Sequence, residues 1–223
     1  MAEDILKDQL DYYRARAREY DRTVDPAPDE KNLPQVETEL ALIREALRSL
    51  PPCKEALELA CGTGIWTQDL LKVAEEVTAL DGAPEMLDVA RTKLGGSARV
   101  RYECIDLFTW QPGRPYDLVF FAFWLSHIPL ERLGRFLEKV TRATRVGGRL
   151  FIVDEPANGK RLSGPTSPES TQTRQLEDGR SFQIIKAYYD PAAIQRNLAR
   201  RGFGEFQTFS GDYFFYICAT KRE

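Results

Sequence analysis

The residues best suited to chemistry in this chain are glycines and acids that follow short apolar runs. The segment from Glu58 to Gly64, with the letters ELACGTG, places Gly62 and Gly64 directly after one such run. Glycine lets the backbone approach a bulky ligand closely, because no Cβ intervenes and a positive φ carries little penalty. The turn therefore predicts a binding site of the kind that dinucleotide-binding folds also require.

The spacing of these glycines bears on which cofactor the turn accepts. The dinucleotide fingerprint G-x-G-x-x-G requires a third glycine at position 67, where this chain has Thr67. A nicotinamide dinucleotide is therefore disfavoured.

Asp81 ends the next apolar run, and an acid at a strand end is well placed to accept hydrogen bonds from both hydroxyls of a ribose. Asp81 is therefore a candidate ribose ligand, and a helix cap or a surface acid is the equal alternative when this residue is taken alone.

His127 is the sole histidine of the chain and lies just past the strongly apolar run 116–122. Because imidazole titrates near neutral pH, His127 is the candidate base that removes a proton from a hydroxyl, an amine or an acidic carbon. The alternative is a structural histidine. A reaction that depends only on proximity and alignment would need no base at all.

These residues need a scaffold in which strands and helices alternate. Strands are predicted at 56–60, 76–80, 100–104, 116–122 and 148–154, and helices between them at 65–74, 84–93 and 130–144. This alternation is typical of a parallel sheet covered by helices. The 223 residues suffice for one α/β domain with a full core, so 1–223 is expected to form a single domain.

The segments outside this alternation are expected to cover the site. Helical spacing over 5–20 and 35–50 predicts two N-terminal helices, so that 1–50 forms a lid. An insertion over 155–185 is expected near the substrate site, irregular over 155–180 because this stretch is rich in Gly, Pro, Ser and Thr. A helix is predicted at 191–201, and a hairpin at 205–220.

The ELACGTG turn, the helix start Ala83-Pro84-Glu85-Met86 after Asp81, and the run from Cys104 to Phe108 resemble class I S-adenosylmethionine-dependent methyltransferases of the small-molecule type. The resemblance spans roughly residues 10–220. It implies a Rossmann-like, mostly parallel sheet of seven strands with the last strand antiparallel and helices on both faces. It also implies S-adenosylmethionine as cofactor and S-adenosylhomocysteine as product.

The same resemblance implies roles for individual residues. An acid early in the glycine turn holds the methionine part of the cofactor, which assigns that role to Glu58. Met86 would lie against the adenine, and Asp106 would bond the adenine amino group, although a simple turn aspartate is the alternative. The full set that the resemblance assigns to the cofactor is Tyr20, Glu58, Ala60, Cys61, Gly62, Thr63, Gly64, Asp81, Gly82, Met86, Asp106, Leu107, Phe108, Ala122 and Phe123.

The acceptor site is expected between the N-terminal helix and the region of His127. Tyr13, Arg16 and Tyr20 share one helix face, and similar helices in small-molecule methyltransferases lie over the cofactor. The alternative is a helix that docks by its aromatic face. Trp124 and Tyr188 complete the candidate substrate residues. The chain lacks the Asn/Asp-Pro-Pro-aromatic motif of enzymes that methylate base or protein amides, so a less polar, aromatic-lined pocket is expected.

Charge and composition disfavour several classes of protein. A net charge of -3 and a pI near 5.5 give no basic footprint for nucleic acid. No run approaches the roughly 18 apolar residues of a membrane span, and the charged N-terminus lacks the apolar run of a signal peptide, so a cytoplasmic location is expected. The four cysteines are scattered without a C-x-x-C pair, so no metal is expected.

The resulting expectation is a monomer or homodimer that methylates a small organic acceptor. The sequence leaves open which acceptor it is and whether oxygen, nitrogen or carbon receives the methyl group. A catalytically silent cofactor-binding or scaffold protein would have the same fold. A nucleic-acid or protein methyltransferase is a further alternative, which the acidic charge balance and the missing amine motif disfavour.

Overall fold

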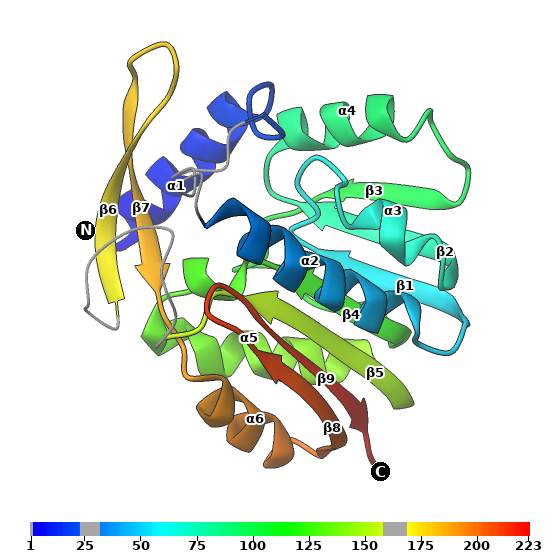
Figure 1. Ribbon diagram of the computed structural model, residues 1–223. Coiled ribbons are helices and arrows are strands. Elements are labelled where there is room, and N and C mark those ends of the chain that lie inside the picture. The colour runs from blue at the N-terminus through cyan, green and yellow to red at the C-terminus, as the bar shows by residue number, and fades with distance from the viewer. Residues whose placement is uncertain (1, 23–31, 158–168) are drawn as a thin grey trace.

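The computed structural model describes residues 2–22, 32–157 and 169–223, and a seven-stranded sheet forms the centre of this part (Figure 1). The strands lie in the order β3-β2-β1-β4-β5-β9-β8. Their bounds are Cys53–Leu59 for β1, Ala74–Asp81 for β2, Val100–Cys104 for β3, Tyr116–Ala122 for β4, Thr144–Asp154 for β5, Phe203–Ser210 for β8 and Phe215–Lys221 for β9.

Strands β1 to β5 are parallel, and the last strand, β9, lies antiparallel between β5 and β8. The predicted sheet is thus confirmed. The strand order reverses at β1, which pairs with β2 on one side and with β4 on the other. Ligands of open α/β sheets bind beyond the carboxyl ends of the strands at such a reversal. The topology therefore puts the expected site just past Leu59 and Ala122.

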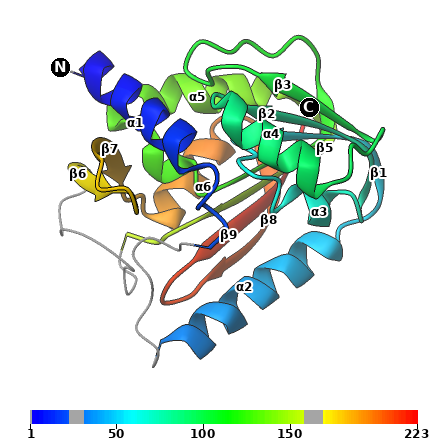
Figure 2. The same cartoon turned by 90° about the horizontal axis from the view of Figure 1, so that it is seen from above.

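Helices cover both faces of the sheet (Figure 2). Helices α5 (Leu130–Ala143) and α6 (Pro191–Ala199) pack on one face. Helices α2 (Leu33–Arg48), α3 (Thr67–Leu70) and α4 (Pro84–Lys93) pack on the other. Strand β4 is buried between them, which is why its sequence is a near-continuous apolar run. No helix within the described ranges is both long enough and apolar enough to cross a membrane.

Helix α1 (Ala2–Arg16) lies beyond the carboxyl ends of the strands, beside a separate hairpin of β6 (Glu169–Gln175) and β7 (Ser181–Ala187), as Figures 1 and 2 both show. Tyr12 of α1 is fully buried in a small cluster with Leu176 and Ile184 of the hairpin. A short 3-10 turn, η1 (Leu125–His127), follows β4 and also contacts β7. The N-terminal helix and the hairpin therefore form one cover over this end of the sheet.

Three sequence predictions were wrong in detail. The N-terminal helix ends at Arg16, and residues 17–22 form turns. The helix expected over 65–74 is shorter and consists of α3 alone, because residue 74 already belongs to β2. The stretch 155–180 is not irregular throughout: β6 begins at Glu169, where its residues pair in register with β7. The parts of the predicted lid and of the predicted insertion that fall on 23–31 and 158–168 lie outside the described residues.

Candidate active site

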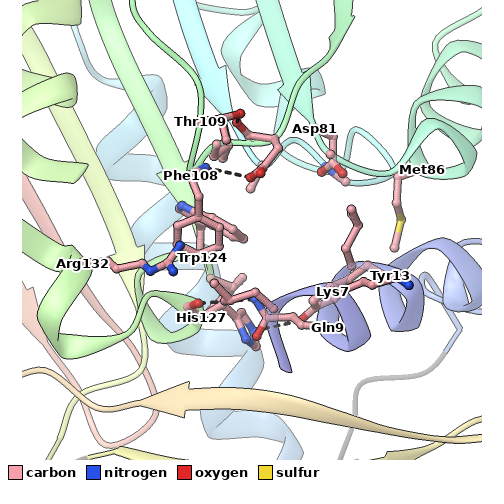
Figure 3. A pocket seen from close by; sticks show the side chains of 18 of the residues that line it. Lys7, Gln9, Tyr13, Asp81, Met86, Phe108, Thr109, Trp124, His127 and Arg132 are labelled. Atoms are coloured by element: carbon pink, nitrogen blue, oxygen red, sulfur yellow. Dashed lines mark hydrogen bonds between the residues drawn. The ribbon is translucent and has the colours of Figure 1, made fainter. Parts of the chain in front are cut away.

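A cavity of about 430 Å³ lies beyond the carboxyl ends of the central strands and beneath α1 (Figure 3). Its walls include Gly62 after β1, Asp81 at the end of β2, Asp106 after β3 and Phe123 after β4, with Tyr13 contributed by α1. A volume of this size suits a cofactor or a small ligand. Residues from four strand ends and one helix thus meet around a single space.

The backbone after β1 is shaped to admit a ligand. Ala60, Gly62 and Gly64 have φ angles of 55°, 52° and 78°. A Cβ at Gly62 would meet nothing within 4 Å, whereas a Cβ at Gly64 would lie 3.2 Å from the Cβ of Ala90 on α4. Gly62 therefore leaves open space at the cavity wall, and Gly64 allows the turn to pack on α4. The positive φ of Ala60, a non-glycine residue on this wall, is typical of functional sites.

Asp81 is held with both carboxylate oxygens oriented by the backbone. Its Oδ2 accepts a 2.8 Å hydrogen bond from the N–H of Gly62, and its Oδ1 accepts one of 2.8 Å from the N–H of Ala83. Each oxygen has a second acceptor position, which suits a pair of ribose hydroxyls. Burial raises the pKa of Asp81 to about 6, against the lowering effect of these hydrogen bonds. The group is thus ionised at neutral pH and able to accept.

Glu58 lies behind the cavity wall. Its side chain is 2% exposed, and its Oε2 accepts a 2.6 Å hydrogen bond from the hydroxyl of Thr67. Burial raises the pKa of Glu58 to about 8, so this carboxyl is largely protonated at neutral pH. A positively charged group nearby would favour the ionised form. Its contact with the methionine ammonium of a cofactor stays a prediction.

Asp106 closes the turn after β3. Its Oδ1 accepts a 2.8 Å hydrogen bond from the N–H of Phe108, so Asp106 is a turn aspartate and a cavity residue at once. The Phe108 ring lies 5.4 Å from the ring of Trp124, and the guanidinium of Arg132 lies 5.3 Å from the centre of the Phe108 ring. The rings form an apolar wall beside a carboxylate, which suits a flat, nitrogen-rich ring such as adenine.

The turn after α1 is fastened to the glycine turn and to α4. The carboxylate of Asp21 accepts a hydrogen bond from the hydroxyl of Thr63 and pairs with Lys93 at 2.5 Å. Tyr20 and Met86 belong to an apolar cluster that joins the end of α1 to the start of α4. Side chains from three segments therefore connect the cover over the cavity to the glycine turn.

His127 is oriented by hydrogen bonds on both ring nitrogens. Its Nδ1 lies 2.9 Å from the carbonyl oxygen of Ile185, so Nδ1 must carry the proton and donate. Its Nε2 then accepts a 2.8 Å hydrogen bond from the hydroxyl of Tyr13. Gln9 bridges β7 and η1, because its Oε1 accepts from the N–H of Ile185 and its Nε2 donates to the carbonyl of His127. Figure 3 shows Gln9 and His127 side by side below the cavity.

The surroundings of His127 disfavour its charged form. Burial lowers the pKa of His127 to about 3, and the positive charges of Lys186, Arg174 and Arg16 act in the same direction. The hydrogen bond to Ile185 acts against them. The imidazole is therefore neutral at physiological pH, and the lone pair of Nε2 accepts the hydrogen bond from Tyr13.

The cavity brings together most of the residues predicted from the sequence. Those that line it are Tyr13, Tyr20, Ala60, Gly62, Asp81, Gly82, Met86, Asp106, Leu107, Phe108, Ala122, Phe123, Trp124 and His127. The predicted residues that do not line it are Arg16, Glu58, Cys61, Thr63, Gly64 and Tyr188. Of these six, Cys61, Thr63 and Gly64 belong to the glycine turn, Glu58 precedes it in β1, Arg16 ends α1 and Tyr188 follows β7.

Sequence reasoning missed a second group of cavity residues: Glu3, Leu6, Lys7, Gln9, Leu10, Thr109 and Arg132. The helical spacing that singled out Tyr13 would have found Leu6, Gln9 and Leu10, had it been extended toward the N-terminus. No comparable pattern marks Thr109 or Arg132.

In the described part of the chain, no group of three or more His, Cys, Asp and Glu side chains is arranged to hold a metal ion.

The comparisons with known proteins agree with this geometry. A family model described as a methyltransferase domain matches residues 56–148. The structure of DhpI in complex with S-adenosylhomocysteine (SAH) is 34% identical, with a TM-score of 0.82, and the match covers 100% of this chain and 99% of that one. The complex of DhpI with S-adenosylmethionine (SAM) and HEP is 35% identical, with a TM-score of 0.80, over 96% and 97% of the two chains.

Curated relatives match over shorter stretches. Malonyl-[acyl-carrier protein] O-methyltransferase 1 of Ilyobacter polytropus is 38% identical over 66 residues, 29% of this chain and 25% of that protein. Trans-aconitate 2-methyltransferase of Rhizobium etli is 37% identical over 113 residues, 49% of this chain and 42% of that protein. The chain spans between a quarter and about half the length of the curated relatives it matches. Taken with the family model and the whole-length similarity to DhpI, the strand order and the cavity show that this chain belongs to the class I S-adenosylmethionine-dependent methyltransferases.

Proposed function

We propose that this chain transfers the methyl group of S-adenosylmethionine to a small organic acceptor in the cavity beneath α1. The proposal depends mainly on the arrangement of Asp81. Backbone N–H groups orient both of its carboxylate oxygens, and Asp81 lines a cavity in which the missing side chain of Gly62 leaves open space. The same cavity contains Tyr13 and His127, so cofactor and acceptor can meet in one space.

The cofactor, when bound, supplies a methyl group on a positively charged sulfur, which a nucleophile displaces in line. In the proposal, Asp81 accepts hydrogen bonds from the ribose, and Asp106 with Phe108 receives the adenine. Glu58 ionises beside the methionine ammonium. Helix α1 covers the site and reduces its contact with water. Alignment of two bound molecules supplies much of the catalysis that such a transfer needs.

We assign His127 the contact with the acceptor, made either through the hydroxyl of Tyr13 or by Nε2 itself when the acceptor displaces that hydroxyl. Nε2 has this role because Nδ1 is already committed to the carbonyl of Ile185. A pKa of about 3 makes Nε2 a weak base, so it orients an O–H or N–H more readily than it removes the proton. The role of base, predicted from the sequence, requires a ligand that raises the pKa of His127.

Replacement of His127 tests this assignment. His127→Ala should reduce turnover while the affinity for S-adenosylmethionine stays within about threefold, because the ring contacts the acceptor and not the cofactor. A base would also give a turnover that declines at low pH with the ring's own pKa, and this limb would vanish in the variant. Unchanged turnover in His127→Ala would remove the residue from the reaction.

The acceptor class draws support from the relatives. DhpI, similar over almost the whole chain, forms a complex with SAM and HEP together, which favours the binding of a second molecule beside the cofactor. Several curated relatives are named as O-methyltransferases, which favours oxygen as the methylated atom. A cytoplasmic location and a monomeric or homodimeric state stay predictions from the sequence.

Titration calorimetry of the full chain with S-adenosylmethionine, S-adenosylhomocysteine and NADH tests the proposal first. Binding of the first two alone would support the cofactor. Formation of S-adenosylhomocysteine would then be measured with a panel of phenols, amines and organic acids. Binding without turnover on any of them would favour the silent scaffold, and failure of folded protein to bind either molecule would overturn the proposal.

A further inference from the structure

Gln9 of α1 is a buried polar residue that the proposed transfer leaves without a role. Its side chain is 3% exposed, and it lines the cavity together with Tyr13, which lies one helical turn further along α1 (Figure 3). Leaving a donor or an acceptor of a buried amide unpaired is costly. The partners of Gln9 therefore show what this residue holds in place.

A closed ring of three hydrogen bonds joins Gln9 to β7 and η1. The N–H of Ile185 donates to Oε1 of Gln9 at 3.0 Å, and Nε2 of Gln9 donates to the carbonyl oxygen of His127 at 3.4 Å. Nδ1 of His127 completes the ring by donating to the carbonyl oxygen of Ile185 at 2.9 Å. Each of the three residues thus donates once and accepts once.

The two partners of Gln9 fix the orientation of its amide. The N–H of Ile185 can only donate, and the carbonyl of His127 can only accept. Gln9 must therefore direct its oxygen to β7 and its nitrogen to η1. An ionised carboxylate at this position would have no donor for the carbonyl of His127, and an apolar side chain would satisfy neither partner.

This ring of hydrogen bonds also decides which nitrogen of the imidazole carries the proton. A tyrosine hydroxyl can donate or accept, so the 2.8 Å contact of Tyr13 with Nε2 is compatible with either tautomer. The carbonyl of Ile185 can only accept, so it requires a proton on Nδ1. Gln9 bonds both the residue whose carbonyl makes this choice and the residue that bears the imidazole.

A neighbouring contact docks α1 on β7 without belonging to the ring. The carboxylate of Asp8 accepts a hydrogen bond from the N–H of Gln183, two residues before Ile185. Asp8 therefore contributes to the same helix–strand contact as Gln9 but has no bond to His127. It separates the general docking of α1 from the specific effect of Gln9.

We propose that Gln9 is a positioning residue that holds His127 in the tautomer protonated on Nδ1, so that the lone pair of Nε2 is directed to Tyr13 and the acceptor. The inference rests on the proposed contact between His127 and the acceptor. Without Gln9, the N–H of Ile185 and the carbonyl of His127 lose their partners, and the imidazole is free to exchange between tautomers. A ring protonated on Nε2 would offer the acceptor a donor in place of a lone pair.

Nitrogen NMR of the free protein tests the inference directly. Because His127 is the sole histidine, labelling with ¹⁵N-histidine gives the signals of one imidazole. We expect the wild type to show Nδ1 protonated and Nε2 unprotonated at pH 7. In Gln9→Met, an unbranched side chain without amide groups, the two ¹⁵N shifts should move toward each other as the tautomers mix. Asp8→Ala is the matched control and should keep the wild-type shifts.

Two NMR results would overturn the inference. One is a wild-type ring protonated on Nε2. The other is a folded Gln9→Met variant whose shifts equal those of the wild type or of Asp8→Ala. Thermal melting checks folding. Gln9→Asn, which keeps the amide but shortens its reach, replaces Gln9→Met if that variant does not fold, and it should show the same mixing.

Kinetics connect the tautomer to the reaction. In Gln9→Met, kcat should fall about tenfold, while the dissociation constant for S-adenosylmethionine stays within about threefold. An unchanged kcat despite mixed tautomers would also overturn the inference. A wild type with the expected tautomer but without methyl transfer to any acceptor would instead contradict the proposed function, because the NMR experiment needs neither cofactor nor acceptor.

Discussion

The hydroxyl of Tyr13 lies 2.8 Å from Nε2 of His127, although 114 residues separate them in the chain. Tyr13 belongs to the cover, and His127 follows the central strand β4. Burial raises the pKa of Tyr13 well above its usual value, so the phenol keeps its proton and donates. This contact joins the helix that closes the cavity to the candidate acceptor-binding residue, and removing it should affect turnover more than cofactor binding.

Tyr13→Phe removes the hydroxyl and keeps the ring. We expect kcat to fall about tenfold, the effect of one buried hydrogen bond, while the dissociation constant for S-adenosylmethionine stays within about twofold. Steady-state kinetics and calorimetry measure the two quantities. Tyr102→Phe is the matched control, because the Tyr102 hydroxyl is buried without a hydrogen-bond partner in the described residues. Equal losses in the two variants would show that the contact has no special role.

Asp81→Ala should weaken binding of S-adenosylmethionine by about 10- to 100-fold, because two hydrogen bonds to the ribose disappear and the N–H groups of Gly62 and Ala83 lose their acceptor. Calorimetry gives the dissociation constants. Asp88→Ala, at an exposed position on α4, should leave them unchanged. Undiminished affinity in Asp81→Ala would mean that the ribose lies elsewhere.

The buried carboxyl of Glu58 should impose a pH dependence on stability. Its pKa is raised from 4.5 to about 8 in the folded protein. Between these values the folded state holds a proton that the unfolded state has lost, so the free energy of unfolding falls as pH rises, by at most about 1.4 kcal/mol per pH unit. The contribution is fully present below pH 4.5 and is lost above pH 8.

Glu58→Gln cannot titrate, so its stability should depend less steeply on pH between 5 and 8. Urea unfolding at several pH values measures the difference from the wild type. Glu138→Gln, on the exposed side of α5, is the control and should follow the wild-type curve. Parallel curves for Glu58→Gln and wild type would show that Glu58 is ionised in the folded protein.

The ion pair between Asp21 and Lys93 should slow the release of cofactor, because it fastens the end of the cover to the glycine turn and α4. Asp21→Asn should raise the dissociation rate of S-adenosylhomocysteine about threefold, the modest effect of a partly exposed pair. Stopped-flow displacement measures this rate. Asp11→Asn, which removes a more exposed partner on α1, serves for comparison and should leave the rate unchanged.

Glu39 should stabilise the fold without contributing to the site. Its carboxylate is 5% exposed and accepts hydrogen bonds of 2.9, 3.0 and 2.9 Å from the N–H groups of Asp212, Tyr213 and Phe214 in the β8–β9 turn. Glu39→Ala should lower the free energy of unfolding by about 2–4 kcal/mol, because three backbone donors lose their acceptor. Glu37→Ala, exposed on the same helix, should change it little. Denaturant unfolding compares the two.

The alternating strands and the glycine turn could be predicted from the sequence, because both depend on local patterns. Apolar runs that alternate with helical spacing specify a parallel sheet, and Gly62, Gly64 and Asp81 follow strand ends where such sheets bind ligands. The hairpin that contains β6 escaped prediction, since the polar residues of β6 form a strand only by pairing with β7, which packs on α1.

The sequence by itself determined the parallel strands and the residues at the strand ends through short-range periodicity and turn chemistry, and the resemblance of its motifs indicated the family. Only the tertiary structure decided which side chains surround His127. Tyr13 and Gln9 belong to α1 and Lys186 belongs to β7, two segments far apart in the chain, and they meet because α1 and β7 pack on the same turn. Such contacts depend on how separate elements dock, and no local pattern of residues carries that information.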